Sequence, residues 1–202
     1  MTNMLEKQLR PAVVLTLVLC VVTGFIYPGI VTAGAQLLFP RAANGSMITV
    51  HGRVIGSALI GQSFHGVEYF HGRPSAAGAG YDATASGGTN KGPTDAKLAD
   101  TLIAWAVDSV VAQDSGVKGE IPSDMVTSSA SGLDPHISPA TATLQVARVA
   151  RARGIPVSRV QALVAAHTEA RQWGVLGEPR VNVLALNLAL DSIAPPTRQV
   201  AR

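Results

Sequence analysis

The stretch PAVVLTLVLCVVTGFIYPGIVTAGAQLLFP, residues 11–40, contains no charged residue. Leu, Val and Ile dominate residues 11–31, and about twenty apolar residues at roughly 1.5 Å each cross the hydrocarbon layer of a bilayer. A helix is suited to that layer because it satisfies its own backbone hydrogen bonds. No later stretch of the 202 residues repeats this composition. We therefore predict one transmembrane helix over residues 11–31.

Charges before the apolar stretch predict its orientation. Residues 1–10 carry Lys7 and Arg10, and positive charges in a short head favour the cytoplasmic side of a membrane. Pro28 has no backbone N–H, so we expect it to end or kink the helix, with residues 32–45 as an interfacial linker. The sequence thus predicts a single-pass protein of the bacterial inner membrane, with a cytoplasmic N-terminus and residues 46–202 in the periplasm.

A cleavable signal peptide is the alternative explanation of the apolar stretch. Ala33, Gly34 and Ala35 fit the small-x-small pattern that precedes a signal-peptidase site, and cleavage there would yield a secreted binding protein. The apolar run is longer than the roughly 7–15 residues of a signal h-region, which favours an anchor. A mature chain that begins at Gln36 would contradict the anchor.

The composition of residues 46–202 indicates one domain without disulfides. The only cysteine, Cys20, lies inside the predicted span, so an external domain must be stable through its core alone. The pI of 9.4 raises the possibility of nucleic-acid binding, but the arginines are not interleaved with aromatic residues. We interpret one cluster of basic residues as a solvated helix face, namely Arg148, Arg151, Arg153 and Arg159.

Strand-forming residues open the predicted domain. Residues 47–50 and 53–60 are rich in Ile and Val, and His51-Gly52 between them suits a tight hairpin turn. Residues 64–92 are dense in Gly, Ser, Ala and Thr and lack apolar periodicity. We expect this segment to be a long loop, ordered or disordered.

Helix signals dominate the later part of the chain. We expect Thr94 to cap a helix that runs to about residue 113, because Leu98, Leu102 and Trp105 recur at helical spacing. Ser138-Pro139 predicts a helix start, and Gly154 predicts the end of that helix. Two further elements complete the expectation, a helix over residues 157–167 and a strand over residues 181–183. The predicted fold class is α+β, with early strands and late helices.

Motifs that carry chemistry are weak in this sequence. The segment GGTNKGP, residues 87–93, resembles a phosphate loop, but Pro93 stands where such a loop needs lysine, so we expect an ordinary turn. The five histidines form no spacing typical of a metal site, and we predict no metal.

Ser131, Asp134 and His136 contain the residue types of a hydrolase triad, so a membrane-anchored periplasmic hydrolase remains an alternative function. Residues so close in sequence seldom converge on one proton, and no nucleophile elbow surrounds Ser131. We favour a tight turn over residues 131–135, in which Asp134 bonds nearby backbone amides.

Long motifs in this chain resemble the family of C subunits (KdpC) of Kdp-type potassium-transporting ATPases, and the resemblance covers nearly the whole chain. Arg10-Pro11 and Tyr27-Pro28 flank the span as they do in that family. Thr89 stands where the family usually has serine. The motifs that carry the resemblance are GSALIGQSF (56–64), YFHGRPSA (69–76), ASGGTN (85–90), SASGLD (129–134) and VNV…LNLALD (181–191).

This resemblance implies a non-catalytic accessory subunit of an ATP-driven potassium uptake complex. Its partners would be a channel-like potassium-translocating subunit, a P-type ATPase subunit and a small membrane subunit, with ATP and potassium bound at those partners. The family is described as stabilising assembly and as a catalytic chaperone that raises the ATP affinity of the hydrolysing subunit.

A periplasmic domain lies a full bilayer away from a cytoplasmic nucleotide site, so we expect any effect on ATP affinity to be indirect. The segment that aligns with the family's proposed nucleotide signature, residues 155–159, also lacks its glutamine. As interface or structural-turn residues we single out Asn90, Ser131 and Asp134, with no catalytic residue of the chain's own.

Overall fold

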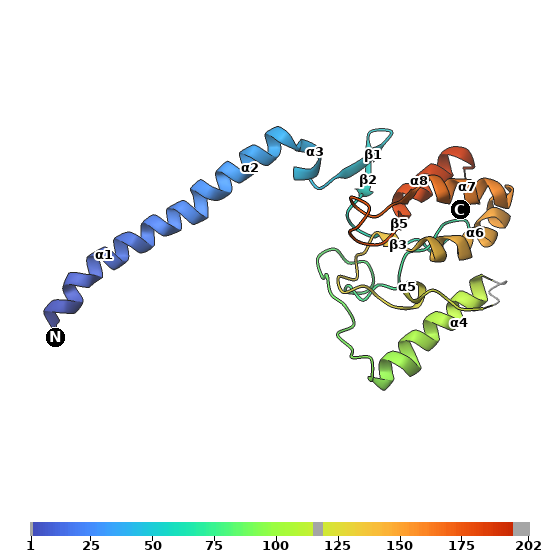
Figure 1. The fold of residues 1–202 in the computed structure, drawn as a ribbon, viewed down its shortest axis with the longest axis horizontal. Helices are drawn as coiled ribbons and strands as arrows, with labels where there is room; N and C mark the ends of the chain where they lie inside the picture. Colours follow the sequence, from blue (N-terminus) through green and yellow to red (C-terminus); the bar gives the residue numbers. More distant parts are fainter. Residues whose placement is uncertain (1, 115–118, 196–202) are drawn as a thin grey trace, which may run out of the picture. The chain divides into compact units, whose positions relative to one another are not determined.

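The computed structural model describes residues 2–114 and 119–195. The chain divides into two compact units, Met1–Ile55 and Gly56–Arg202. Figure 1 shows the first unit as a long helix followed by a hairpin, and the second as a mixture of helices and short strands. The predicted α+β class, with early strands and late helices, is confirmed.

The first unit begins with one uninterrupted helical run. α1 (Thr2–Val21) passes through a π-helical turn, η1 (Val22–Ile26), into α2 (Tyr27–Leu38). Proline lacks an N–H for the i−4 carbonyl and its ring clashes there, whereas a π-helical turn shifts the bonding to i−5. The wide turn directly before Pro28 therefore lets the helix continue to Leu38, so residues 32–38 of the expected interfacial linker are helical.

The helix Lys7–Leu38 is long and apolar enough to cross a membrane. Its 32 residues contain a window with a mean hydropathy of 2.3, none of which is buried inside the structure. At the rise of an α-helix this run is about 48 Å long, more than the hydrocarbon layer needs. Thr23 satisfies its own hydroxyl by donating to the carbonyl of Leu19 at 2.7 Å, which suits a lipid environment.

The short helix α3 (Pro40–Ala43) leads into the predicted hairpin. β1 (Met47–Val50) pairs with β2 (Arg53–Ser57). His51 and Gly52 both have positive φ, 48° and 76°, as the type I′ turn of a two-residue hairpin requires. The hairpin is confirmed, although β2 ends three residues before the predicted Ile60.

The second unit holds a small sheet and the remaining helices. Three antiparallel strands occur in the order β3-β5-β4, with His136 opposite Asn182 and Thr168 opposite Val181. β3 (His136–Ile137) and β4 (Thr168–Glu169) are too short for an alternating pattern, so the sequence did not indicate them. The other elements are η2 (Leu98–Ile103), α4 (Ala104–Gln113), α5 (Ser123–Val126), α6 (Pro139–Arg153), α7 (Val157–Ala166), β5 (Arg180–Asn182) and α8 (Val183–Ile193).

Helix α6 has both of the ends that the sequence predicts. The Ser138 hydroxyl accepts the backbone N–H of Thr141 at 3.1 Å, and Gly154 closes the helix with a φ of 65°. Asp124 of α5 accepts hydrogen bonds from the Ser138 N–H and the Thr141 hydroxyl, which ties α5 to this helix start. A hydrophobic core surrounds α6; among its members are Phe70, Ile137, Val146, Val149, Val160, Val181, Leu186 and Leu190.

A loop segment, residues 67–71, lies against α6 and α8 and is held by side-chain amides. Asn187 accepts the N–H of Phe70 and donates to its carbonyl, both at 2.9 Å. Gln145 likewise accepts the N–H of His71 at 2.8 Å and donates to the His71 carbonyl at 3.1 Å. These two side chains replace the backbone partners that a neighbouring strand would supply. Residues 67–71, which are part of the segment 64–92, are therefore held in one conformation.

Two arginines of α6 complete this arrangement and correct our interpretation of a solvated basic face. Arg148, 4% exposed, donates to the carbonyls of Val67 and Tyr69 at 2.7 and 2.8 Å and pairs with buried Asp114 at 2.8 Å. Arg153, 9% exposed, donates to the carbonyl of Glu68 at 2.8 Å. The two guanidinium groups therefore donate hydrogen bonds to acceptors inside the domain rather than to water.

The start of the helix before α4 differs from the sequence prediction by one residue. Asp95, not Thr94, supplies the cap, because its carboxylate accepts the N–H of Leu98 at 3.2 Å. Aspartate is a stronger N-cap than threonine, and its charge favours a helix start.

We predict that Gln145→Ala lowers the free energy of unfolding by about 3 kcal/mol, because it leaves the N–H and carbonyl of His71 buried without partners. Urea unfolding of the full chain in mild detergent, followed by circular dichroism, measures this change. The matched control is Gln161→Ala on the exposed face of α7, which should change stability by less than about 0.5 kcal/mol. Equal effects of the two substitutions would contradict the role assigned to Gln145.

Candidate functional site

Two loops of the second unit meet where the sequence predicted a functional turn. Ser131 and Asp134 lie between α5 and β3, in a loop over residues 127–135, and a second loop over residues 72–92 runs beside it. The N–H of Gly87 and the hydroxyl of Ser86 both donate to the Ser131 carbonyl, at 2.9 and 3.0 Å. We call residues 72–92 and 127–135 together the paired loops.

Gly132 fixes how closely the paired loops approach. Its φ is +65°, and a Cβ at this position would lie 2.6 Å from both the Ala77 nitrogen and the Gly87 oxygen. Only glycine tolerates both conditions. The Gly132 carbonyl in turn accepts the Ser75 hydroxyl at 2.6 Å. Residues 131–135 bend at Ser131 and Gly132, and they lie against a loop that is distant in sequence.

Asp134 is the electrostatic centre of the paired loops. Its carboxylate accepts the His136 N–H at 3.0 Å, as the sequence predicted, and pairs with Arg73 at 3.1 Å. Partial burial opposes ionisation of Asp134, but the hydrogen bonds from His136 and Arg73 outweigh it and hold the pKa of the carboxyl below its ordinary value of 3.8. Asp134 therefore acts as an anion that organises both loops.

Arg73 and Tyr81 also hold the paired loops together, although sequence reasoning did not single them out. Two N–H groups of Arg73 reach the carbonyls of Thr127 and Ser128, both at 3.4 Å. The Tyr81 hydroxyl donates to the Arg73 carbonyl at 2.6 Å, and burial raises the pKa of Tyr81 to about 12. Both residues lie within or beside the family motifs, but spacing alone gives no sign that Arg73 reaches Asp134.

The predicted site residues do not all converge. Asn90 is exposed on the far part of its loop and has a φ of 53°, a conformation that asparagine tolerates better than most residues. Nearby, Lys91 forms an ion pair of 3.0 Å with Asp95. The segment that resembled a phosphate loop therefore contacts the N-cap of the following helix. Asn90 is thus an exposed loop residue, separate from the contacts of Ser131 and Asp134.

The arrangement of a hydrolase triad is not seen in the described residues. The Ser131 hydroxyl has Ser129 and the Leu133 N–H as hydrogen-bond partners, at 3.3 and 3.1 Å. The His136 Nδ1 instead faces the Asp134 carboxylate at 3.6 Å. Ser131 is therefore positioned to shape a turn, without a general base beside it.

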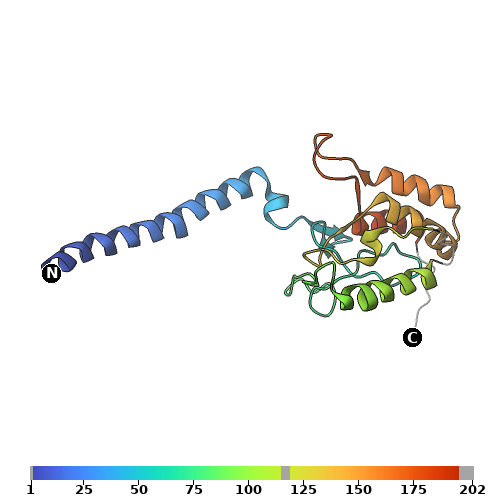
Figure 2. The same ribbon diagram turned by 60° about the horizontal axis from the view of Figure 1, so that its bottom comes forward.

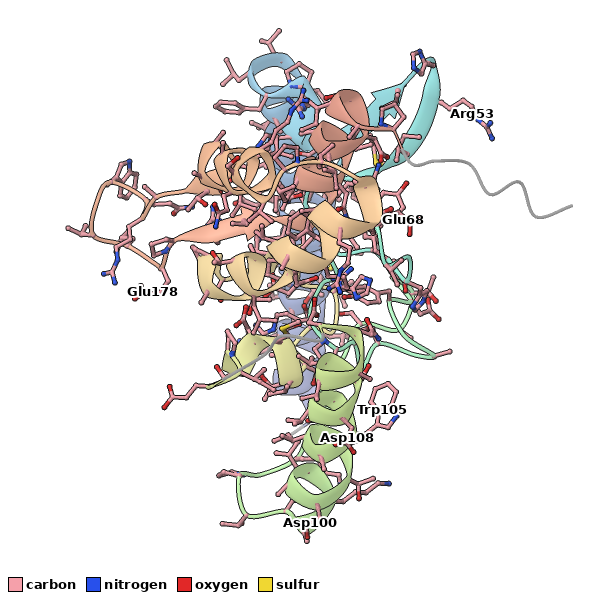
Figure 3. The ribbon with its side chains drawn as sticks, turned by 90° about the vertical axis from the view of Figure 1, so that its right-hand side faces the viewer. Arg53, Glu68, Asp100, Trp105, Asp108 and Glu178 are labelled. Atoms are coloured by element: carbon pink, nitrogen blue, oxygen red, sulfur yellow. The ribbon has the colours of Figure 1, made fainter. Side chains whose placement is uncertain are left out.

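A cavity of about 410 Å³ lies between residues 63–81 and α4. Trp105, which projects from α4 and is 70% exposed, forms part of its wall (Figure 3). His71 lines it and donates a ring N–H to the Gly66 carbonyl at 2.9 Å. Burial and the nearby Arg148 lower the pKa of His71, so this histidine is a neutral structural group at neutral pH.

Within residues 2–114 and 119–195, no three His, Cys, Asp or Glu side chains gather in a way that would hold a metal ion. The polar groups of the paired loops bond mainly to one another and to backbone. The arrangement is thus one of two rigid loops that present a shaped surface.

Comparison with known proteins identifies the family. The model of the family described as "KdpC: K+-transporting ATPase, c chain" matches residues 9–192. The chain belongs to the KdpC family. It is 66% identical to the potassium-transporting ATPase KdpC subunit of Gemmatimonas aurantiaca, over 96% of this chain and 97% of that protein. The corresponding subunit of Nitratidesulfovibrio vulgaris is 56% identical over 92% and 94% of the two chains, and that of Koribacter versatilis 53% over 95% and 97%.

These matches confirm the resemblance seen in the sequence motifs. The residues that the family model matches include those of the apolar helix and of the paired loops. Membership also favours an accessory subunit of a potassium-transporting ATPase over the alternative of a membrane-anchored hydrolase. The apolar N-terminal helix is consistent with a single-pass member of a membrane transport complex.

We predict that Asp134→Asn makes stability less sensitive to acid. The pKa of Asp134 is lowered in the fold, so its charge stabilises the native state above pH 3.8, and this contribution disappears as pH falls through the folded-state pKa. At pH 5 the free energy of unfolding of the native chain should exceed that of the variant by about 1–2 kcal/mol. This difference should shrink towards pH 2. Urea unfolding across this pH range measures it.

The matched control for this experiment is Glu169→Gln. Glu169 pairs with Arg180 at 3.0 Å at an exposed site, where ion pairs contribute little. A stability difference for Asp134→Asn that stays constant from pH 5 to pH 2 would contradict the charged role of Asp134.

Proposed function

We propose that this chain is the non-catalytic accessory subunit of a high-affinity, ATP-driven potassium uptake complex of the bacterial inner membrane. The single observation that carries the proposal is the family match over residues 9–192, which includes both the apolar helix and the extramembrane domain. Its partners are a channel-like potassium-translocating subunit, a P-type ATPase subunit and a small membrane subunit. ATP and potassium bind at these partners.

The proposed topology has residues 1–10 in the cytoplasm and the domain in the periplasm. Lys7 and Arg10 lie at the start of the apolar run, and positive charges in a short head favour the cytoplasmic side. The helix Lys7–Leu38 exposes its whole apolar surface within the chain. In the assembled complex this surface packs against membrane helices of the channel-like subunit.

The domain contributes to assembly rather than to chemistry of its own. Asp134, Arg73 and Ser131 are occupied in holding the paired loops together. This commitment supports a rigid surface that another subunit recognises. The effect on ATP affinity is indirect: the subunit binds one conformational state of the pump more tightly than another, and that difference appears as a change in affinity at the nucleotide site.

The topology predicts opposite labelling of two introduced cysteines. In a Cys20→Ser background, Asp100→Cys lies on the exposed surface of the domain and Gln8→Cys lies in the head. A membrane-impermeant maleimide added to cells with a permeabilised outer membrane should label the first and leave the second unlabelled until the inner membrane is opened. The reverse pattern would place the domain in the cytoplasm and make direct contact with ATP feasible.

Affinity purification tests the accessory role itself. A tagged full chain, isolated in mild detergent from its host grown at limiting potassium, should bring down a P-type ATPase subunit and a channel-like subunit in equal amounts by mass spectrometry. Deletion of residues 11–31 with a signal peptide in their place should reduce this recovery strongly, because the helix contacts are lost. Recovery of the intact chain alone would contradict the accessory role.

A further inference from the structure

A hairpin between β4 and β5 carries apolar side chains that the described core does not use. Residues 171–178 form it, and we call it the Trp173 hairpin. Figure 2 shows it as an orange-red loop that stands away from the helices of the second unit. Trp173 is 90% exposed, Val175 71% and Leu176 50%. Large apolar side chains gathered at one projecting tip mark an interaction surface.

The turn at the tip is unusual for the residue that it carries. Trp173 and Gly174 have φ values of 53° and 78°, and the Val175 N–H donates to the Gln172 carbonyl at 3.2 Å. This is a type I′ turn, whose first central position favours asparagine, aspartate or glycine. A bulky residue with positive φ is an outlier that the surrounding structure must impose. The fold thus holds an indole at a position that disfavours it.

Backbone hydrogen bonds hold the hairpin in one shape, and an ion pair joins its two arms. Gln172 and Leu176 exchange two backbone hydrogen bonds, both of 2.9 Å. Arg171 donates to the two carboxylate oxygens of Glu178 at 2.7 and 2.6 Å, across the two arms of the hairpin (Figure 3 labels Glu178). Both bonds come from Nη2 of Arg171, and because the two side chains are exposed, this ion pair adds little to the order that the backbone bonds give. The tip is consequently presented without a large loss of conformational entropy on binding.

Charge at the hairpin argues for a protein partner rather than a lipid surface. The positive charge of Arg171 is balanced by Glu178, and that of Arg180 at the base is balanced by Glu169. Binding to anionic lipid needs a net positive surface, which the hairpin does not offer. An apolar centre surrounded by a neutral polar rim is instead the composition of a protein–protein contact.

We propose that the Trp173 hairpin inserts into an apolar pocket on another subunit of the potassium-transporting ATPase, with the indole as the anchor. The inference rests on the accessory role proposed above. Three apolar side chains cover far less than the roughly 800 Å² per partner of a standard interface. The hairpin is therefore the anchor point within a larger contact, and tryptophan is among the residues that most often dominate such contacts.

The substitution Trp173→Asn separates folding from binding. Asparagine followed by Gly174 is the preferred pair for a type I′ turn, so the full chain in detergent should melt at the same temperature or higher. Recovery of the P-type ATPase and channel-like subunits on the tagged variant, after equal washing, should fall by about tenfold or more, as expected for the loss of a dominant tryptophan.

Two variants control for the loss of an exposed aromatic residue. Trp173→Phe keeps an apolar ring at the tip and should retain most of the recovery. Trp105→Gln removes the other exposed tryptophan, which lies on α4, and should leave recovery unchanged. Loss of recovery with Trp105→Gln but not with Trp173→Asn would overturn the proposal.

The remaining outcomes distinguish this inference from the proposed function. If the native chain and Trp173→Asn recover both subunits equally, the anchor is overturned and the accessory role stands. If the native chain recovers neither subunit, the accessory role fails and the anchor fails with it. In a Trp105→Phe chain reconstituted alone into vesicles, quenching of Trp173 fluorescence by brominated phospholipids would assign the tip to the lipid surface instead and overturn the proposal.

Discussion

The domain depends on the satisfaction of one buried backbone segment by side chains. Residues 67–71 have neither a helix ladder nor a neighbouring strand, yet Phe70 is fully buried among them. Buried peptide groups without hydrogen-bond partners would cost more free energy than the small net stability of a folded domain. Gln145 and Asn187 supply one donor and one acceptor each, and Arg148 and Arg153 cover the carbonyls that remain. Two helices can therefore pack on a loop as though it were a strand.

In the paired loops, too, side chains supply hydrogen-bond partners for the backbone. Arg73 lies two residues after the buried segment, and its guanidinium reaches Asp134 and two carbonyls of the neighbouring loop. Gly132 then lets the two backbones approach to a distance that any side chain would prevent. The surface of the paired loops is thus continuous with the hydrogen-bond network of the core. A change in this network would therefore alter the surface of the paired loops even where no surface residue is changed.

The sequence was sufficient to predict those elements that a few adjacent residues determine. The apolar run, the His51-Gly52 turn, and the Ser138 and Gly154 ends of α6 each follow from a few adjacent residues, and each is present. The buried roles of Arg148 and Arg153 were missed because a basic residue on a helix gives no local sign of which loop it will contact. The partner of Asp134 was missed for the same reason, since Arg73 lies 61 residues away. Asp134 itself was found because its bond to His136 is a local one.

The separation in sequence between the amides and the segment they hold bears on how the domain is made. Gln145 lies 74 residues after His71, and Asn187 lies 117 residues after Phe70. Synthesis proceeds from the N-terminus, so the peptide groups of Phe70 wait until α8 has been made before they find their partner. Contacts of such high order slow the search for the native state and leave apolar residues uncovered during it. For most of its time on the ribosome this domain is thus an unfinished chain, and its final helix is the element that closes it.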